Sequence, residues 1–130
     1  MKVLLINGSP RKNGNMSLVL AEMVKIFKEE GVETELIQIG NMDIRGGLSS
    51  TFDELNKYFT ICEMPVVSSQ YWNSVHGGKP GEAAGDAEGP QTMRALARNM
   101  SFTIKSIALG KERYGLPEKE EPVATNFIRQ

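Results

Sequence analysis

The sequence has little cysteine and no excess of positive charge. Cys62 is the single cysteine among 130 residues, which excludes an internal disulfide and a metal or iron-sulfur site built from the cysteines of one chain. Fifteen basic residues stand against sixteen acidic ones, so no broad positive surface is predicted for a nucleic acid or an anionic membrane. The lone thiol favours a reducing, cytoplasmic location.

Long apolar runs are also missing. The first apolar run ends at Asn7, and no later run approaches the roughly twenty apolar residues of a membrane span. We therefore expect neither a signal peptide nor a transmembrane helix. With 40% apolar residues, the chain has enough material for one domain with a core. We expect that domain over residues 1–116 and a charged, exposed tail over residues 117–130.

The first forty residues predict a strand, a helix and a second strand. Residues 2–6 are aliphatic and end at a turn sequence, which predicts a strand buried on both faces. Apolar residues at helical spacing follow Ser17 and predict a helix with Gly31 as its C-cap. Residues 33–39 alternate in part and predict a strand nearer the sheet edge. Together these elements predict one right-handed βαβ unit.

The rest of the chain predicts two more helices and a third strand. Thr51 and Glu54 have the spacing of a capping box, which places a helix start at Thr51. Residues 64–70 predict a short strand that opens beside a proline. Residues 71–89 contain five glycines and predict a long loop, either functional or mobile. Residues 90–109 predict the last helix.

The loop over residues 7–17 carries the clearest chemical signal. A helix amino terminus offers unpaired N–H groups and a partial positive charge, so a Gly-, Ser- and Asn-rich turn before it suits a phosphate. Two glycines allow close approach, two hydroxyls can donate, and one of two cations can neutralise charge: Gly8 and Gly14, Ser9 and Ser17, Arg11 or Lys12. The alternative is a plain turn and helix cap with solvated cations. Neither a Walker sequence nor G-x-G-x-x-G is present, which argues against an ATPase and a standard dinucleotide site.

A family resemblance favours the phosphate interpretation. The string Ile6-Asn7-Gly8-Ser9-Pro10-Arg11-Lys12-Asn13-Gly14-Asn15 strongly resembles the phosphate loop of the flavodoxin-like NADPH-dependent FMN reductases, a family that includes iron-sulfur flavoproteins. Residues 37–46, 50–77 and 120–129 resemble later parts of that family. The resemblance implies FMN as cofactor and NADPH as electron donor. It also implies that five residues contact the FMN phosphate: Ser9, Arg11, Asn15, Met16 and Ser17.

The chain departs from this family after Gly46. Family members commonly continue there into a cysteine cluster and later a Ser-Pro-x-Tyr flavin loop, whereas here Gly47-Leu48 follows. About sixty residues of the usual middle are absent, at about thirty residues per crossover unit. We therefore expect a truncated flavodoxin-like α/β fold, a doubly wound parallel sheet of about three strands in the order 2-1-3. Exposed sheet edges predict a homo-oligomer or low stability.

The leading interpretation is an FMN-binding, NAD(P)H-dependent oxidoreductase with an unspecified small-molecule electron acceptor. The flavin would carry the chemistry, so no catalytic side chain is assigned. The alternatives are an FMN- or phosphate-binding module without turnover, and an inactive, internally deleted family member. The loop that carries Trp72 and His76 could lie beside the flavin ring, with Trp72 stacked on it. The favoured alternative is that the aromatic residues pin the loop to the core or to a partner chain and that His76 is a solvated loop residue. Cys62 is expected to be a small buried hydrophobe.

Overall fold

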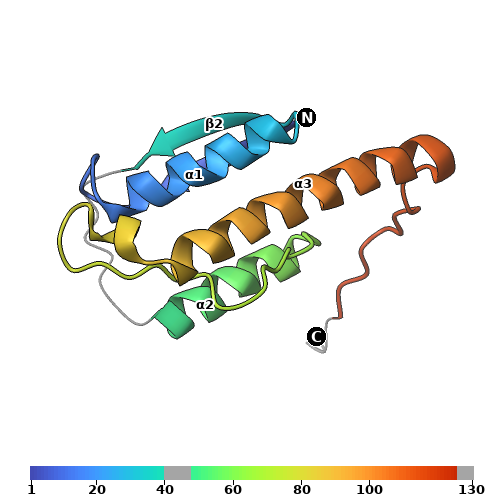
Figure 1. Cartoon of the computed structure of the whole chain (residues 1–130). Coiled ribbons are helices and arrows are strands. Elements are labelled where there is room, and N and C mark those ends of the chain that lie inside the picture. The colour runs from blue at the N-terminus through green and yellow to red at the C-terminus, as the bar shows by residue number, and fades with distance from the viewer. Residues whose placement is uncertain (40–47, 126–130) are drawn as a thin grey trace.

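The computed structural model describes residues 1–39 and 48–125, the side chains of residues 48–51 excepted. Two strands, three α-helices and one short 3-10 helix follow one another along this part of the chain (Figure 1). In order they are β1 (Lys2–Asn7), α1 (Asn15–Glu29), β2 (Glu33–Gln38), α2 (Leu48–Ile61), η1 (Glu82–Gly85) and α3 (Glu88–Tyr114).

The predicted βαβ unit is confirmed. β1 and β2 pair in parallel with a register that runs from Lys2 opposite Glu33 to Asn7 opposite Gln38. α1 ends beside Gly31, whose φ of 69° is left-handed and favours glycine. The turn at Gly31 lets the chain reverse directly into β2. The second strand thus lies beside the first, as a flavodoxin-like order requires.

The core forms where α1 is covered on two sides. α1 packs against the sheet and against α3, so it lies between them (Figure 1). Val3 and Leu5 of β1 face α1 and are buried. Val19, Leu20, Met23, Ile26 and Phe27 of α1 complete the core with Val32, Ala83, Met93 and Ala97. Burial of these apolar side chains is the main stabilising term of the fold.

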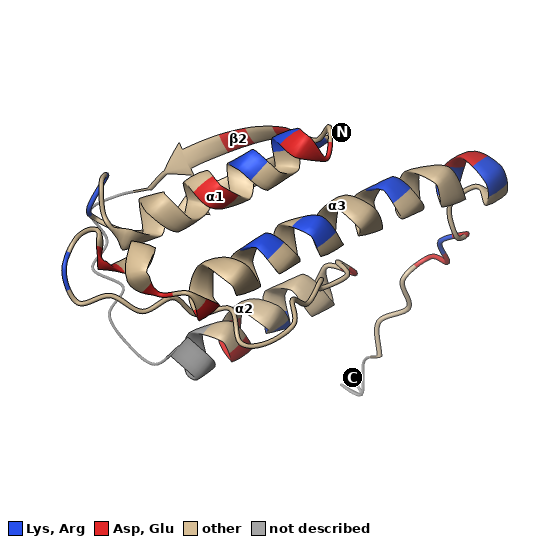
Figure 2. Cartoon of the chain, viewed as in Figure 1, with Lys and Arg blue, Asp and Glu red and all other residues tan. Residues whose placement is uncertain are grey.

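Ion pairs support the contact between α1 and α3. Basic residues recur along α3 (Figure 2). Two of them reach acids of the α1 region: Lys105 Nζ lies 3.0 Å from Glu30 and Arg94 Nη1 lies 3.8 Å from Glu22. All four side chains are partly exposed, so each pair contributes less than about 1 kcal/mol.

The predicted third strand is wrong. Residues 64–70 adopt no strand, and the described part of the chain has a two-stranded sheet in the order β1-β2. Pro65 has no backbone N–H, so the segment lacks one of the donors that would pair it with a neighbouring strand. The segment lies against α3 instead of β1, where the Asn99 side chain donates to the Ser68 carbonyl at 2.8 Å. The α/β class and the order of the first two strands are confirmed.

The expected burial of β1 on both faces is also wrong. Val3 is 5% exposed on the α1 side, whereas Leu4 and Ile6 on the other face are 51% and 55% exposed. No described helix covers that outer face, because the element that packs against the sheet is α1. Ile37 and Ile39 lie on the same outer face and are exposed as well. One side of the sheet is therefore open, and it combines these apolar side chains with the charged Lys2, Glu33 and Glu35.

Both later helices begin earlier than predicted. α2 begins at Leu48, which places Thr51 inside the helix and not at its N-cap, and α3 runs from Glu88 to Tyr114 in place of 90–109. No other described helix or strand packs against α2. For that reason Cys62, just beyond α2, is exposed and not buried as expected. None of the helices in the described ranges is long and apolar enough to cross a membrane.

The long loop before α3 is fixed by a carboxylate. Asp86 accepts hydrogen bonds from the His76 N–H at 2.7 Å and from the Gly89 N–H at 3.1 Å. These backbone donors, the His76 N–H first, hold the pKa of Asp86 below its usual value. Gly89 at the start of α3 is tightly packed, since a Cβ there would lie 2.9 Å from the Ser74 carbonyl oxygen.

Substitution of Gly89 by alanine tests this packing. We expect Gly89→Ala to lower the free energy of unfolding by about 1–3 kcal/mol, because backbone atoms must move to admit the methyl group. Gly110→Ala is the matched control on the same helix, where a new Cβ meets nothing within 4 Å. It should stabilise the helix by up to about 1 kcal/mol. Urea unfolding of both variants measures the difference, and equal shifts would contradict the packing.

Asp86 makes the stability depend on pH. Its pKa is lower in the folded chain than in the unfolded one, so its contribution is present above the unfolded pKa and is lost as the pH falls through the folded pKa. The stability difference between wild type and Asp86→Asn should therefore shrink between about pH 5 and pH 2. Thermal unfolding at several pH values gives this difference. A gap that stays constant over this range would argue against the two hydrogen bonds.

Candidate functional site

The amino terminus of α1 presents unpaired backbone donors. Gly14 is the N-cap residue, with φ −87° and ψ −178° and no side-chain cap. The first intrahelical hydrogen bond runs from the Leu18 N–H to the Gly14 carbonyl at 3.3 Å. The N–H groups of Asn15, Met16 and Ser17 therefore have no acceptor within the helix. Together with the helix dipole, they form the geometry that binds an anion.

Asn7 organises the loop between β1 and α1. Its side chain is fully buried at the carboxyl end of β1. The amide oxygen accepts from the Ser9 N–H at 3.0 Å, and the amide nitrogen donates to Ser17 Oγ at 3.2 Å. Gln38 at the end of β2 donates to the Ser9 carbonyl. The ends of both strands thus hold the loop in one shape.

Ser17 and Ser9 differ in what they offer to a ligand. The Ser17 hydroxyl donates its only hydrogen to the Lys12 carbonyl, so this side chain stabilises the loop and leaves the backbone N–H of Ser17 as the donor available to a ligand. Ser9 Oγ accepts from the Arg11 N–H at 3.3 Å. Accepting that bond leaves the Ser9 O–H able to donate.

The cations of the loop are exposed. The side chains of Arg11 and Lys12 lie at the surface, and Met16 in the first turn of α1 is 47% exposed. Gly14 sits in a tight turn, since a Cβ would lie 3.1 Å from Arg11 Cβ. Because both side chains are exposed, Arg11 or Lys12 can reach from the solvent side toward an anion bound at the first turn of α1.

The Asn15 side chain binds a distant loop. Its amide nitrogen donates to the Gly77 carbonyl at 3.0 Å, and its amide oxygen accepts from the N–H groups of Gly81 and Ala83 at 2.9 and 3.2 Å. Five residues were predicted for this site, and the structure gathers all of them around the start of α1: Ser9, Arg11, Asn15, Met16 and Ser17. The Asn15 side chain alone turns toward residues 77–83.

Sequence reasoning missed Asn7 and Gln38. Both are polar residues at the carboxyl ends of parallel strands, the end at which ligands bind in doubly wound sheets. Asn7 was treated as a turn residue because Asn-Gly-Ser-Pro is a common turn sequence. The available signal was the alternation along β1, in which the polar Asn7 follows Val3 and Leu5 on the buried side of the strand.

The aromatic residues after residue 70 lie near α2. Tyr71 and Trp72 are exposed, and the Trp72 ring meets Phe52 edge-on with 6.4 Å between centroids. His76 Nε2 lies 3.2 Å from Ser74 Oγ. The Trp72 contact joins this segment to α2, whereas the His76 contact lies within the segment itself.

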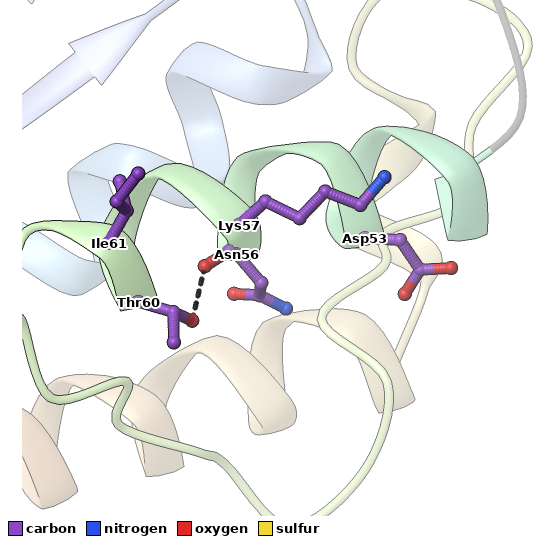
Figure 3. Close-up of a pocket in the computed structure, with 5 residues that line it drawn as sticks. All are labelled: Asp53, Asn56, Lys57, Thr60 and Ile61. Carbon is purple, nitrogen blue, oxygen red and sulfur yellow. Dashed lines mark hydrogen bonds between the residues drawn. The ribbon is translucent and has the colours of Figure 1, made fainter. Parts of the chain in front are cut away.

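Two surface depressions lie away from the loop. One is lined by Asp53, Asn56, Lys57, Thr60 and Ile61 of α2 (Figure 3). The Thr60 hydroxyl in it donates to the Asn56 carbonyl of its own helix at 2.7 Å, a usual bond of helical threonine. The other lies between residues 65–68 and α3. Across the described ranges, no group of three or more His, Cys, Asp and Glu residues could hold a metal ion.

Comparison with known proteins identifies the amino-terminal part. Residues 1–54 match the family model of the NADPH-dependent FMN reductases. An iron-sulfur flavoprotein of Methanocaldococcus jannaschii is 43% identical over 44 residues, which are 34% of this chain and 23% of that protein. The match thus spans about a quarter of the length of this curated relative. No solved structure matched the chain. The matched residues 1–54 contain β1, α1, β2 and the loop between β1 and α1, so the similarity to the NADPH-dependent FMN reductases covers the βαβ unit and the candidate site.

Proposed function

We propose that the protein binds FMN and that the loop between β1 and α1 holds the FMN phosphate. The observation that carries this proposal is the set of first-turn N–H groups in α1 that have no acceptor within the helix. They lie in the segment that matches the family model. A phosphate has the charge and the acceptor oxygens that such a helix terminus favours.

Each predicted site residue has a distinct role in this proposal. The Ser9 hydroxyl donates to a phosphate oxygen, and the Arg11 guanidinium neutralises its charge. Asn15, Met16 and Ser17 contribute backbone N–H groups, because the side chains of Asn15 and Ser17 are bonded elsewhere. Lys12 is the second cation within the loop.

For the bound flavin, we propose NAD(P)H-dependent oxidoreductase activity. The flavin supplies hydride and electron transfer when bound, while the residues of this chain bind and orient it. The alternative is a binding module without turnover. One observation favours that alternative: the segment expected beside β1 lies against α3, so the described residues form a phosphate cradle without a matching wall for the ring.

Absorbance spectra test the proposal directly. The purified protein is titrated with FMN, and the complex is then mixed with NADPH without oxygen. FMN binding with bleaching at a catalytic rate supports the oxidoreductase, and binding without bleaching supports the module. We expect Ser9→Ala and Arg11→Ala each to weaken FMN binding by about 1 kcal/mol or more, at least about fivefold in Kd.

The matched control for Arg11→Ala is Lys111→Ala. Lys111 is an exposed cation in the last turn of α3, so its loss changes the net charge equally but leaves the loop intact. Its FMN affinity should equal that of the wild type. A protein that ignores FMN, or a loop variant with unchanged affinity, would refute the phosphate site.

We also propose that two copies associate along the free edge of β1. The Glu33 N–H donates to the Met1 carbonyl and the Ile39 N–H to the Asn7 carbonyl. The backbone N–H and C=O groups of the odd-numbered residues of β1 therefore point toward β2. The backbone groups of Leu4 and Ile6 then face the opposite edge, where the described sheet has no strand. Antiparallel pairing of β1 with its own copy about Leu4 satisfies these groups and keeps α1 on one face.

Leu4→Lys tests this association. In the paired dimer the two substituted residues stand opposite each other, and like charges there are destabilising. We expect the variant to be monomeric at micromolar concentrations at which the wild type is a dimer, as judged by sedimentation. Tyr114→Lys introduces the same charge at an exposed site at the far end of α3 and should remain dimeric. A monomeric wild type would remove this proposal.

A further inference from the structure

Asn15 joins the start of α1 to a segment more than sixty residues away. Its side chain makes three hydrogen bonds to the backbone of residues 77–83, with one donated to Gly77 and two accepted from Gly81 and Ala83. An asparagine amide can donate two bonds and accept about two. Three of these four are thus directed at one loop, which leaves the side chain little capacity to hold a ligand.

The contact between Asn15 and this loop is tight. A Cβ on Gly77 would lie 2.4 Å from Asn15 Nδ2 and 3.0 Å from the Ala83 nitrogen. Only a residue without a side chain lets the backbone come so close. On the far side of the loop, Ala83 is fully buried in the core. The loop is therefore seated on α1 by both a polar and an apolar contact.

The loop is also braced within itself. The Glu82 carboxylate accepts from the N–H groups of Gly78 and Lys79 at 2.8 and 2.9 Å. Gly81 has a φ of 89°, a left-handed conformation that glycine adopts without strain. Residues 77–83 thus reach Asn15 as a preformed turn, so the three hydrogen bonds of one side chain act on the turn as a unit.

Figure 1 shows where this turn lies. The segment before η1 comes back beside the start of α1, next to the loop that follows β1. The unpaired N–H groups of Asn15, Met16 and Ser17 are therefore flanked by two loops, residues 8–14 and residues 77–83. The Asn15 side chain holds the second of these loops against the helix terminus.

We infer that Asn15 is a positioning residue, which seats residues 77–83 as the second wall of the phosphate site. This inference rests on the proposed FMN function for the identity of the ligand. The Asn15 backbone N–H faces the phosphate, while its side chain sets the distance between the two loops. Loss of the side chain releases the turn and opens the site on that side.

Hydrogen exchange of single amides, followed by NMR without ligand, tests the seating. In Asn15→Ala the amides of Gly81 and Ala83 should exchange about tenfold faster than in the wild type, since each loses its acceptor. The Leu5 amide in β1 should be unaffected. Alanine is a good helix former, so the variant is expected to keep α1. Asn13→Ala removes a neighbouring exposed asparagine and should leave both loop amides unchanged.

FMN titration tests the consequence for the site. Asn15→Ala should raise the Kd for FMN about three- to tenfold. In the wild type, bound FMN should slow amide exchange at Gly81 and Ala83, and in Asn15→Ala it should not. Glu82→Ala disrupts the same turn without touching α1, so a wall made by this turn predicts a weaker Kd there too. Asn15→Asp keeps the acceptor oxygen and should retain part of the protection at both amides.

The outcomes separate this inference from the proposed function. Unchanged exchange at Gly81 and Ala83 in Asn15→Ala overturns the seating. Faster exchange with an unchanged Kd for FMN in both Asn15→Ala and Glu82→Ala overturns the role of the turn as a wall. A wild-type protein that ignores FMN refutes the proposed function and the wall together, and the exchange data then still decide whether Asn15 holds the turn.

Discussion

The rest of the structure depends on the burial of α1 between two layers. Phe27 is completely buried and Val19 nearly so, and both lie on a helix that the sheet covers on one side and α3 on the other. With two strands in the described part of the chain, the sheet alone offers too little area to bury such a helix. α3 supplies the missing cover, and the polar loop before α3 is carried onto the start of α1 as a result.

This arrangement explains which parts of the fold the sequence predicts. β1, α1 and β2 follow from short-range signals, because aliphatic runs, helical spacing and Gly31 act within forty residues. The fate of residues 64–70 does not follow, because Val66 and Val67 would suit a strand or a contact with a helix equally well. Their position depends on whether β1 or α3 offers the better neighbour, and the structure places them at Asn99 of α3.

The candidate site divides in the same way. The exposed donors at the start of α1 are predictable, since Gly14 and the residues around it define a turn before a helix within one segment. The roles of Asn7 and of the Asn15 side chain are not. Asn7 bonds both ends of its own loop, and Asn15 bonds residues 62 to 68 positions away. Neither partner can be identified from spacing alone.

The unpaired edge of β1 bears on what a bound flavin could do. The phosphate end of the proposed site needs only β1, α1 and the loop between them, which Asn7 and Gln38 stabilise from the strands. The ring end needs a wall beyond β1, at the edge where Leu4 and Ile6 present unpaired backbone groups. Because the two ends depend on different elements, cofactor binding can persist where turnover is lost. For turnover, another element such as a second copy would have to supply that wall, because residues 77–83 lie at the start of α1.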